Sequence, residues 1–247
     1  MGWLKNLMGQ KQAGTFDPST LKVDMHSHLI PDIDDGSDSL EDSILMILAL
    51  KEMGYEKIIT TPHIKLGSFD NTTEIIREGE ALVKAELQKR GIDIPFEAAA
   101  EYFFDFSFME RIEKGDIMTF SNNHMLVEFA FGQPPVGEKE MFFALQMKGY
   151  KPILAHFERY AYFHGSTSRA QELRDKGIKI QVNIGSFYGQ YGPQIQRQAE
   201  LMLKNGVIDL LATDCHRLEQ LELYKGNLGH KNMVKLNDLA HRNLEFL

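Results

Sequence analysis

The chain has 247 residues, of which 43% are hydrophobic and 25% charged, and its formal net charge is −8. These values are typical of a globular chain that forms one large domain or two small ones, and the acidic excess disfavours a nucleic-acid backbone as the main partner. The single cysteine excludes an intrachain disulfide and suits a reducing cytoplasm, while no apolar run approaches the roughly 18 residues of a membrane helix.

The first twenty residues differ from the rest, so we divide the chain into a lead-in at residues 1–20 and one domain at residues 21–247. Apolar residues recur at helical spacing from Trp3 to Met8, but Lys5 interrupts them, which disfavours a secretory signal. We expect a loosely ordered lead-in; the alternative is a helix that docks on a partner or a membrane surface. The expected location is the cytoplasm, with peripheral contact to the inner membrane as the alternative.

Short apolar runs alternate with longer amphipathic stretches from residue 21 onward. This alternation predicts a parallel sheet, because each helix returns the chain to start the next strand in the same direction. No G-x-G-x-x-G follows the first run, which disfavours an open dinucleotide-binding sheet and favours a single-domain α/β fold of the TIM-like barrel type. The predicted strands are 21–26, 57–63, 94–102, 125–131, 151–156, 178–184 and 207–214.

Two of the predicted helices have recognisable ends. The helix at 39–54 has Ser39 or Asp38 as its N-cap and ends at Gly54, and a second helix covers 71–91. Three further glycines stand just before the next apolar run: Gly149, Gly177 and Gly206.

Ionisable residues collect at the carboxyl ends of the predicted strands, the face where barrels build their active sites. His26 and His28, two apart on a strand, should point to the same face. So many buried acids would repel one another unless cations compensate, so we predict a site for more than one divalent ion; a purely structural polar network is the alternative. Ligands of this kind favour Mn, Fe, Zn or Co. The candidate ligands are His26, His28, Asp35, His63, Glu101, Glu128, His156, Asp214 and His216.

Six motifs occur in an order that indicates a family. They are DMHSHLIPDIDDGSDSLEDS, IITTPH, AAAEYFFD, LVEFAF, KPILAHFERY and LLATDCHRL. Over roughly residues 21 to 220, the chain resembles the polymerase and histidinol phosphatase (PHP) superfamily. It is most similar to the bacterial manganese-dependent protein tyrosine phosphatases that regulate capsule and exopolysaccharide synthesis. The H-x-H opening is shared with other metallohydrolases, whereas the D-D-G loop together with A-H-x-E-R-Y indicates the narrower group.

The resemblance implies a distorted (β/α)7 barrel that holds three metal ions, with manganese expected. Arg159 corresponds to the phosphate-contacting arginine of the family, and a guanidinium suits that role because it donates to two phosphate oxygens at once. The implied reaction is hydrolysis of a phosphate monoester by a hydroxide that bridges two ions, with His63 or His216 as a proton donor. One ion would be bound by His26, His28, Glu101 and Asp214, a second by Glu101, Glu128 and His156, and a third by Asp35, His63 and His216.

The chain departs from the family pattern at several positions. Phe157 stands where many relatives have proline, and Ala99 and Ala100 replace a glycine-containing pair before the glutamate. Some relatives carry a second arginine after the D-x-H motif, at the position of Leu221, and Arg217 is the residue that could compensate.

The implied substrate is phosphotyrosine in the tyrosine-rich tail of a membrane-bound polysaccharide-synthesis kinase. A histidinol-phosphate phosphatase with the same metal site is the alternative enzyme, and the net charge of −8 disfavours a nuclease or proofreading role. A non-catalytic binding module for the kinase is disfavoured by the complete ligand set. No sequence feature fixes the oligomeric state.

Cys215 lies between two predicted ligands, which raises the question whether its thiol is the nucleophile. Cysteine-dependent tyrosine phosphatases carry C-x5-R, but the corresponding position here is Leu221, and no glycine-rich loop lies between the two. We therefore predict that Cys215 is a small buried residue that takes no part in the reaction.

Overall fold

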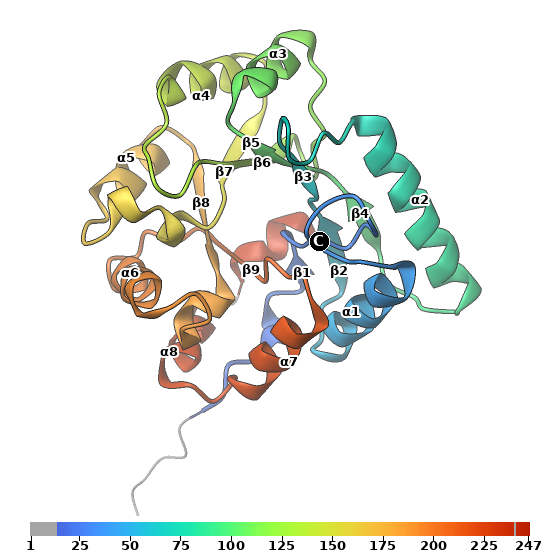
Figure 1. The fold of residues 1–247 in the computed structure, drawn as a ribbon. Coiled ribbons are helices and arrows are strands. Elements are labelled where there is room, and N and C mark those ends of the chain that lie inside the picture. The colour runs from blue at the N-terminus through green and yellow to red at the C-terminus, as the bar shows by residue number, and fades with distance from the viewer. Residues whose placement is uncertain (1–13, 240) are drawn as a thin grey trace, which may run out of the picture.

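The computed structural model describes residues 14–239 and 241–247, in which helices surround a ring of strands (Figure 1). The expected helical segment at Trp3 to Met8 lies outside these residues. The strands are β1 (Val23–Asp24), β2 (Lys57–Thr60), β3 (His63–Ile64), β4 (Phe96–Ala98), β5 (Glu101–Phe103), β6 (His124–Glu128), β7 (Lys151–Leu154), β8 (Lys179–Asn183) and β9 (Leu210–Ala212). The α-helices are α1 (Leu40–Glu52), α2 (Thr73–Lys89), α3 (Phe106–Lys114), α4 (Glu138–Met147), α5 (Ser168–Asp175), α6 (Pro193–Lys204), α7 (Leu218–Gly226) and α8 (Lys231–Val234).

The strands pair in parallel, in the orders β1-β2-β4 and β3-β5-β6-β7-β8-β9. A parallel bridge between Ser27 and Cys215 joins the segment after β9 back to the segment after β1. Beside it, Asp214 N donates to His26 O and His28 N to Cys215 O, each at 2.9 Å. The predicted single-domain α/β fold, with parallel strands surrounded by helices, is confirmed.

Two predicted strands, 57–63 and 94–102, are each divided into two short strands. Pro62 lies between β2 and β3 and has no N–H to donate, so the ladder is interrupted there. The chain resumes with His63 directly opposite Glu101 in the register of β3 and β5. The interruption therefore places two candidate ligands side by side.

Helix ends follow the predicted signals. Ser39 is the N-cap of α1, where its side chain accepts from Asp42 N, and Gly54 after the helix has φ +92°. Thr72 caps α2 in the same way. Such caps satisfy amide donors that a helix N-terminus otherwise leaves unpaired.

Two apolar clusters hold the barrel together. The larger fills the space between strands and helices. The smaller is built from alternate strand residues such as Val23, Leu126 and Leu210, and also contains Phe246. Alternation along a strand sends successive side chains to opposite faces, so this second cluster is the interior of the ring.

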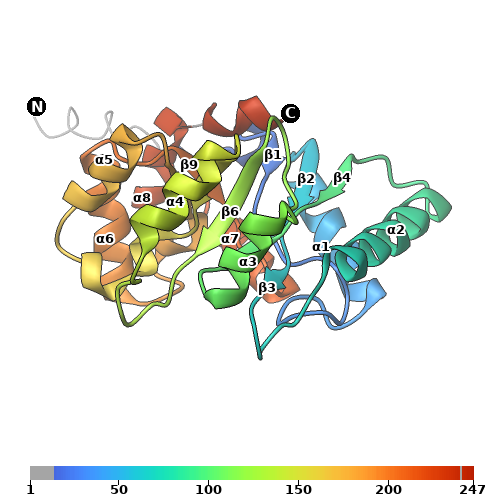
Figure 2. The ribbon, with the colours of Figure 1, turned by 90° about the horizontal axis from the view of Figure 1, so that it is seen from above.

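The C-terminal turns cover the amino ends of the strands (Figure 2). Phe246 is fully buried there, and its carbonyl accepts from Lys57 Nζ at 2.9 Å. Asn243 Nδ2 donates to Val23 O at 2.9 Å and to Leu211 O at 2.6 Å, which bridges β1 and β9. One end of the ring is thus closed, and the carboxyl end remains for a site.

The described part of the lead-in packs on the barrel: Phe16 is buried, and its N–H donates to Leu228 O at 2.9 Å. The domain boundary at residue 21 stays a prediction. Among the described helices, none combines the length and apolar character that crossing a bilayer requires.

Candidate metal centre

A pocket of about 280 Å³ opens at the carboxyl ends of the strands. The buried His26 and His28 lie behind its lining, with His26 Nε2 3.2 Å from Glu101 Oε2. All nine predicted ligands therefore collect at one end of the barrel. The lining residues are Asp35, His63, Lys65, Phe69, Glu101, Glu128, Phe131, His156, Arg159, Tyr191, Asp214, His216 and Gln220.

His26 and His28 converge as expected, with their Nε2 atoms 3.4 Å apart. Strand alternation is not the reason, because β1 ends at Asp24. Each ring is instead held through Nδ1: that of His26 lies 3.1 Å from Gln181 Oε1, and that of His28 lies 2.7 Å from Asp34 Oδ2. An acceptor on Nδ1 fixes the tautomer that leaves Nε2 free for a cation.

Glu101 lies at the middle of the cluster. Its Oε1 is 3.0 Å from His156 Nε2, and its Oε2 is 3.2 Å from both His26 Nε2 and His63 Nδ1. Burial alone would raise the pKa of this carboxyl, but the charges of His26 and His63 hold the pKa well below its usual value. Glu101 is thus an anion in contact with three histidines, His26, His63 and His156, from different segments of the barrel.

Glu128 and His156 occupy the side of the pocket next to Glu101. Burial, together with the charge of Glu101, raises the pKa of Glu128 to about 8. His156 Nε2 lies 3.6 Å from Glu128 Oε1. Two carboxylates this close repel each other unless a proton or a cation lies between them.

Asp35, His63 and His216 form the outer side of the cluster. Asp35 Oδ1 is 3.5 Å from His63 Nε2 and 3.4 Å from His216 Nε2. The His216 ring also stacks on His28, with centroids 4.0 Å apart, so this group adjoins the inner one.

The side chains fit a set of divalent ions. In the described residues, four overlapping groups bring three or four ligand atoms within 4.8 Å of one another, and together they include all nine candidates. His63 Nδ1 and His156 Nδ1 are buried and make no hydrogen bond, although His63 Nδ1 lies 3.2 Å from Glu101 at an unsuitable angle. Imidazole and carboxylate donors without a thiolate suit Mn, Fe, Co or Zn.

The backbone at the site is unusual. His156 has φ +30° and Asp214 has φ +50°, values that non-glycine residues adopt at a cost of about 1–3 kcal/mol. Each residue lies two positions after a strand, β7 or β9, and both line the pocket.

Arg159 lies on the short turn after β7 and reaches the pocket, as predicted. Its Nη1 donates to Asp214 Oδ2 at 3.1 Å, and its guanidinium carbon lies 4.3 Å from the Phe131 ring centroid and 4.8 Å from that of Tyr191. Stacking on two aromatic rings restricts the guanidinium to one orientation.

Arg217 is not among the described residues that line the pocket. Its Nη2 donates to Asp38 at 3.1 Å and its Nη1 to the His216 carbonyl at 3.0 Å. Leu221 is buried in the apolar core. The structure thus leaves compensation by Arg217 a prediction.

Cys215 is buried away from the pocket lining, with its Sγ 3.6 Å from Met46 Sδ. Burial raises the pKa of its thiol well above the usual value. A neutral buried thiol is a poor nucleophile, in agreement with the prediction that Cys215 takes no part in the reaction.

Sequence reasoning missed several residues that support the site. Asp34 Oδ2 accepts from the His28 ring at 2.7 Å. Asn183 Nδ2 donates to Asp214 Oδ2 at 2.6 Å. The D-D-G motif could have revealed Asp34, but no local pattern marks a polar residue inside a strand such as β8.

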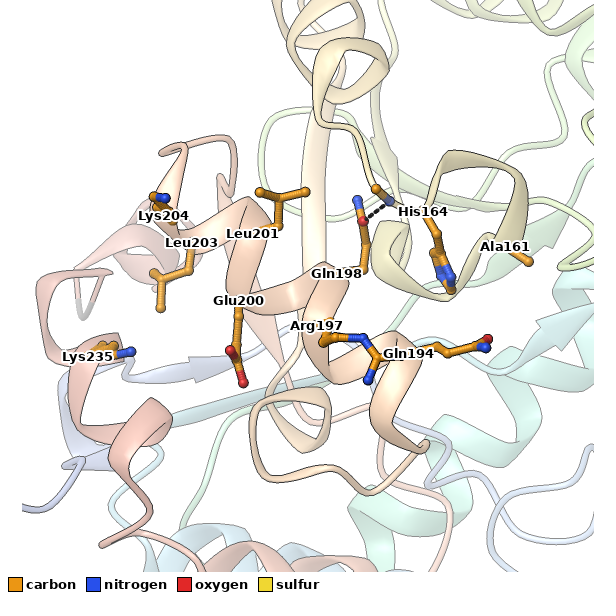
Figure 3. Close-up of a pocket in the computed structure, with 11 residues that line it drawn as sticks. Ala161, His164, Gln194, Arg197, Gln198, Glu200, Leu201, Leu203, Lys204 and Lys235 are labelled. Atoms are coloured by element: carbon orange, nitrogen blue, oxygen red, sulfur yellow. Dashed lines mark hydrogen bonds between the residues drawn. The ribbon is translucent and has the colours of Figure 1, made fainter.

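A larger hollow of about 960 Å³ lies on the outside of the barrel along α6 (Figure 3). It contains His164, which the sequence places outside the metal site, but its acidic lining is limited to Glu200 in the described residues. The hollow therefore lacks the ligand groups of the barrel pocket.

Comparison with known proteins identifies relatives over most of the chain. The family model for capsular polysaccharide synthesis proteins CpsB/CapC matches residues 22–222. The tyrosine-protein phosphatase YwqE of Bacillus subtilis is 29% identical over 198 residues, which cover 80% of this chain and 78% of YwqE. The tyrosine-protein phosphatase CpsB of Streptococcus pneumoniae is 27% identical over 212 residues, which cover 82% and 86% of the two chains.

Solved structures agree with these relatives. One from the YwqE and CpsB pair of metal-dependent tyrosine phosphatases matches with a TM-score of 0.75 and 27% identity, covering 90% of this chain and 94% of that chain. A histidinol phosphate phosphatase from Lactococcus lactis, solved with zinc, L-histidinol and phosphate, matches with a TM-score of 0.51 and 16% identity, over 85% of this chain and 93% of that chain. At that identity the second match shows the fold alone.

Proposed function

The chain belongs to the CpsB/CapC family of capsular polysaccharide synthesis proteins, and on that premise we propose that it is a metal-dependent protein tyrosine phosphatase that regulates capsule or exopolysaccharide synthesis. The observation that carries this proposal is the convergence of nine imidazole and carboxylate ligands with Arg159 at one end of the barrel. Relatives named as tyrosine-protein phosphatases support it.

We propose that three divalent ions, manganese first among them, occupy the cluster. When bound, such ions act as Lewis acids toward phosphate and make water a better nucleophile at neutral pH. By the family pattern, the inner ion would be held by His26, His28, Glu101 and Asp214, the second by Glu101, Glu128 and His156, and the outer by Asp35, His63 and His216, all of which lie in the overlapping ligand groups of the pocket.

The chain's own residues bind and orient the phosphate. The Arg159 guanidinium lines the pocket and contacts the rings of Phe131 and Tyr191. It donates to phosphate oxygens as their charge grows in the transition state. His63 or His216, both in the pocket lining, would supply a proton to the departing phenolate only where its ring is not fully occupied by the outer ion.

Aromatic walls favour a phosphate carried on a phenyl ring. Phe131 lines the pocket and is 37% exposed. Phe69 lies opposite the His63 ring, nearly parallel at 9° with centroids 5.3 Å apart. Flat apolar surfaces of this kind pack well against the ring of a tyrosine. The tyrosine-rich tail of a polysaccharide-synthesis kinase in the cytoplasm is the substrate that we propose.

The test is hydrolysis of a phosphotyrosine peptide and of histidinol phosphate by the protein loaded with manganese, each with and without a chelator. We expect the peptide to be hydrolysed faster and both activities to depend on the metal. A preference for histidinol phosphate would move the protein to the alternative activity, and no hydrolysis of either would support a non-catalytic role.

A further inference from the structure

A lysine that sequence reasoning did not single out lines the same pocket. Lys65 follows β3 and begins a tight turn in which Lys65 N donates to Phe69 O at 2.9 Å and Phe69 N to Lys65 O at 2.8 Å. Because both bonds join residues 65 and 69, the turn holds the Lys65 backbone in place.

The Lys65 ammonium is not engaged by an acid. Its Nζ lies 4.3 Å from the centroid of the Phe103 ring. Within the described residues it makes no ion pair within 4.0 Å and no hydrogen bond, although the pocket contains several carboxylates. By contrast, Lys57 Nζ is paired with Glu97 at 3.2 Å. The Lys65 charge is therefore available to a ligand.

Lys65 and Arg159 stand on different sides of the acidic cluster. Phe103, under the Lys65 ammonium, is opposite Glu128 in the register of β5 and β6, whereas Arg159 bonds Asp214 beyond β9.

Apart from Lys65 and Arg159, no lysine or arginine of the described residues lines this pocket. Arg217 is directed to Asp38, so without Lys65 no basic side chain would face a bound phosphate on the side opposite Arg159. We propose that Lys65 binds the phosphate of the substrate there, as the second basic side chain of the substrate site. This inference rests on the proposed phosphatase function.

The experiment compares wild type with Lys65→Gln, Lys65→Met and Lys65→Arg. Lys114→Gln is the matched control, since the Lys114 side chain is 70% exposed on α3. Binding of inorganic phosphate to the manganese-loaded proteins is measured by calorimetry, and KM and kcat are measured with a small aryl phosphate and with a phosphotyrosine peptide.

We expect phosphate binding to weaken about three- to tenfold in Lys65→Gln and Lys65→Met, as for the loss of one partly exposed charged hydrogen bond. KM should rise by the same factor for both substrates, and Lys65→Arg and Lys114→Gln should stay near wild type. Methionine keeps the contact with Phe103, so a purely structural role would spare that variant.

Unchanged phosphate binding in Lys65→Gln would overturn the assignment. A KM that rises for the peptide alone would also overturn it, because Lys65 would then contact a residue that flanks the phosphotyrosine in the peptide. If wild type hydrolyses no aryl phosphate, the phosphatase function fails, and the phosphate titration still decides the role of Lys65.

Discussion

Asp34 offers a strict test of how the site is organised, because it supports the ligands without lining the pocket. Its Oδ2 accepts from His28 Nδ1 at 2.7 Å and from His63 N at 2.9 Å, and its Oδ1 accepts from Gly36 N at 2.9 Å. The change Asp34→Asn keeps the shape but removes the charge. It also turns one acceptor into a donor, so one of these N–H groups loses its partner.

The expected loss follows from the hydrogen bonds. A bond to a charged acceptor contributes about 1.5–3 kcal/mol and a neutral one about 1 kcal/mol. The difference of about 0.5–2 kcal/mol corresponds to about 2- to 30-fold in affinity for the ion that His28 would hold, which overlaps the range found for such supporting partners.

The assay is a manganese titration against a competing chelator, with thermal unfolding of the metal-free proteins measured in parallel. Asp38→Asn is the control, because Asp38 lies in the same loop and its side chain is 73% exposed. Weaker metal binding in Asp34→Asn with a well-folded protein would support the reasoning. Wild-type affinity in that variant would refute the claim that Asp34 positions His28.

Three further predictions concern the same site. His26→Ala or Asp214→Ala should lower manganese-supported phosphatase activity by about 10²-fold or more while circular dichroism stays native; full activity in both would defeat the ligand assignment. Cys215→Ser should keep most of the activity, and complete loss in a folded variant would restore the thiol to the mechanism. Manganese affinity should rise with pH between about 6 and 9, because an ion must displace the protons that its ligands hold in the metal-free protein. Burial lowers the pKa of His26, but the charges of Glu101 and Asp214 raise it to about 9. Burial and the charge of Glu101 raise the pKa of Glu128 to about 8. A dissociation constant that is equal at pH 6.5 and 8.0 would contradict this.

The sequence predicted the architecture because the relevant signals are local. Alternation of apolar runs with amphipathic stretches requires a parallel sheet. The caps at Ser39 and the stop at Gly54 depend only on the preferences of neighbouring residues. Since parallel strands end at one face, the histidines and acids at those ends were expected to meet, and they do.

Other features depended on contacts between distant segments. The direction of Arg217 is set by Asp38, 179 residues away, and Gln181 reaches His26 from another strand, 155 residues away. Pro62 interrupts a predicted strand because its missing N–H falls where a ladder bond is needed. None of these contacts leaves a periodic trace in the sequence.

The sequence by itself thus determined which residues end the strands, and through them the chemistry that the barrel can hold. Only the tertiary structure decided which acceptor holds each imidazole, which cations face the pocket, and that Cys215 is buried between elements rather than exposed to a substrate. The physical reason is that strand and helix patterns arise from neighbours in the chain, whereas side-chain direction at a strand end is set by packing and hydrogen bonds across the ring.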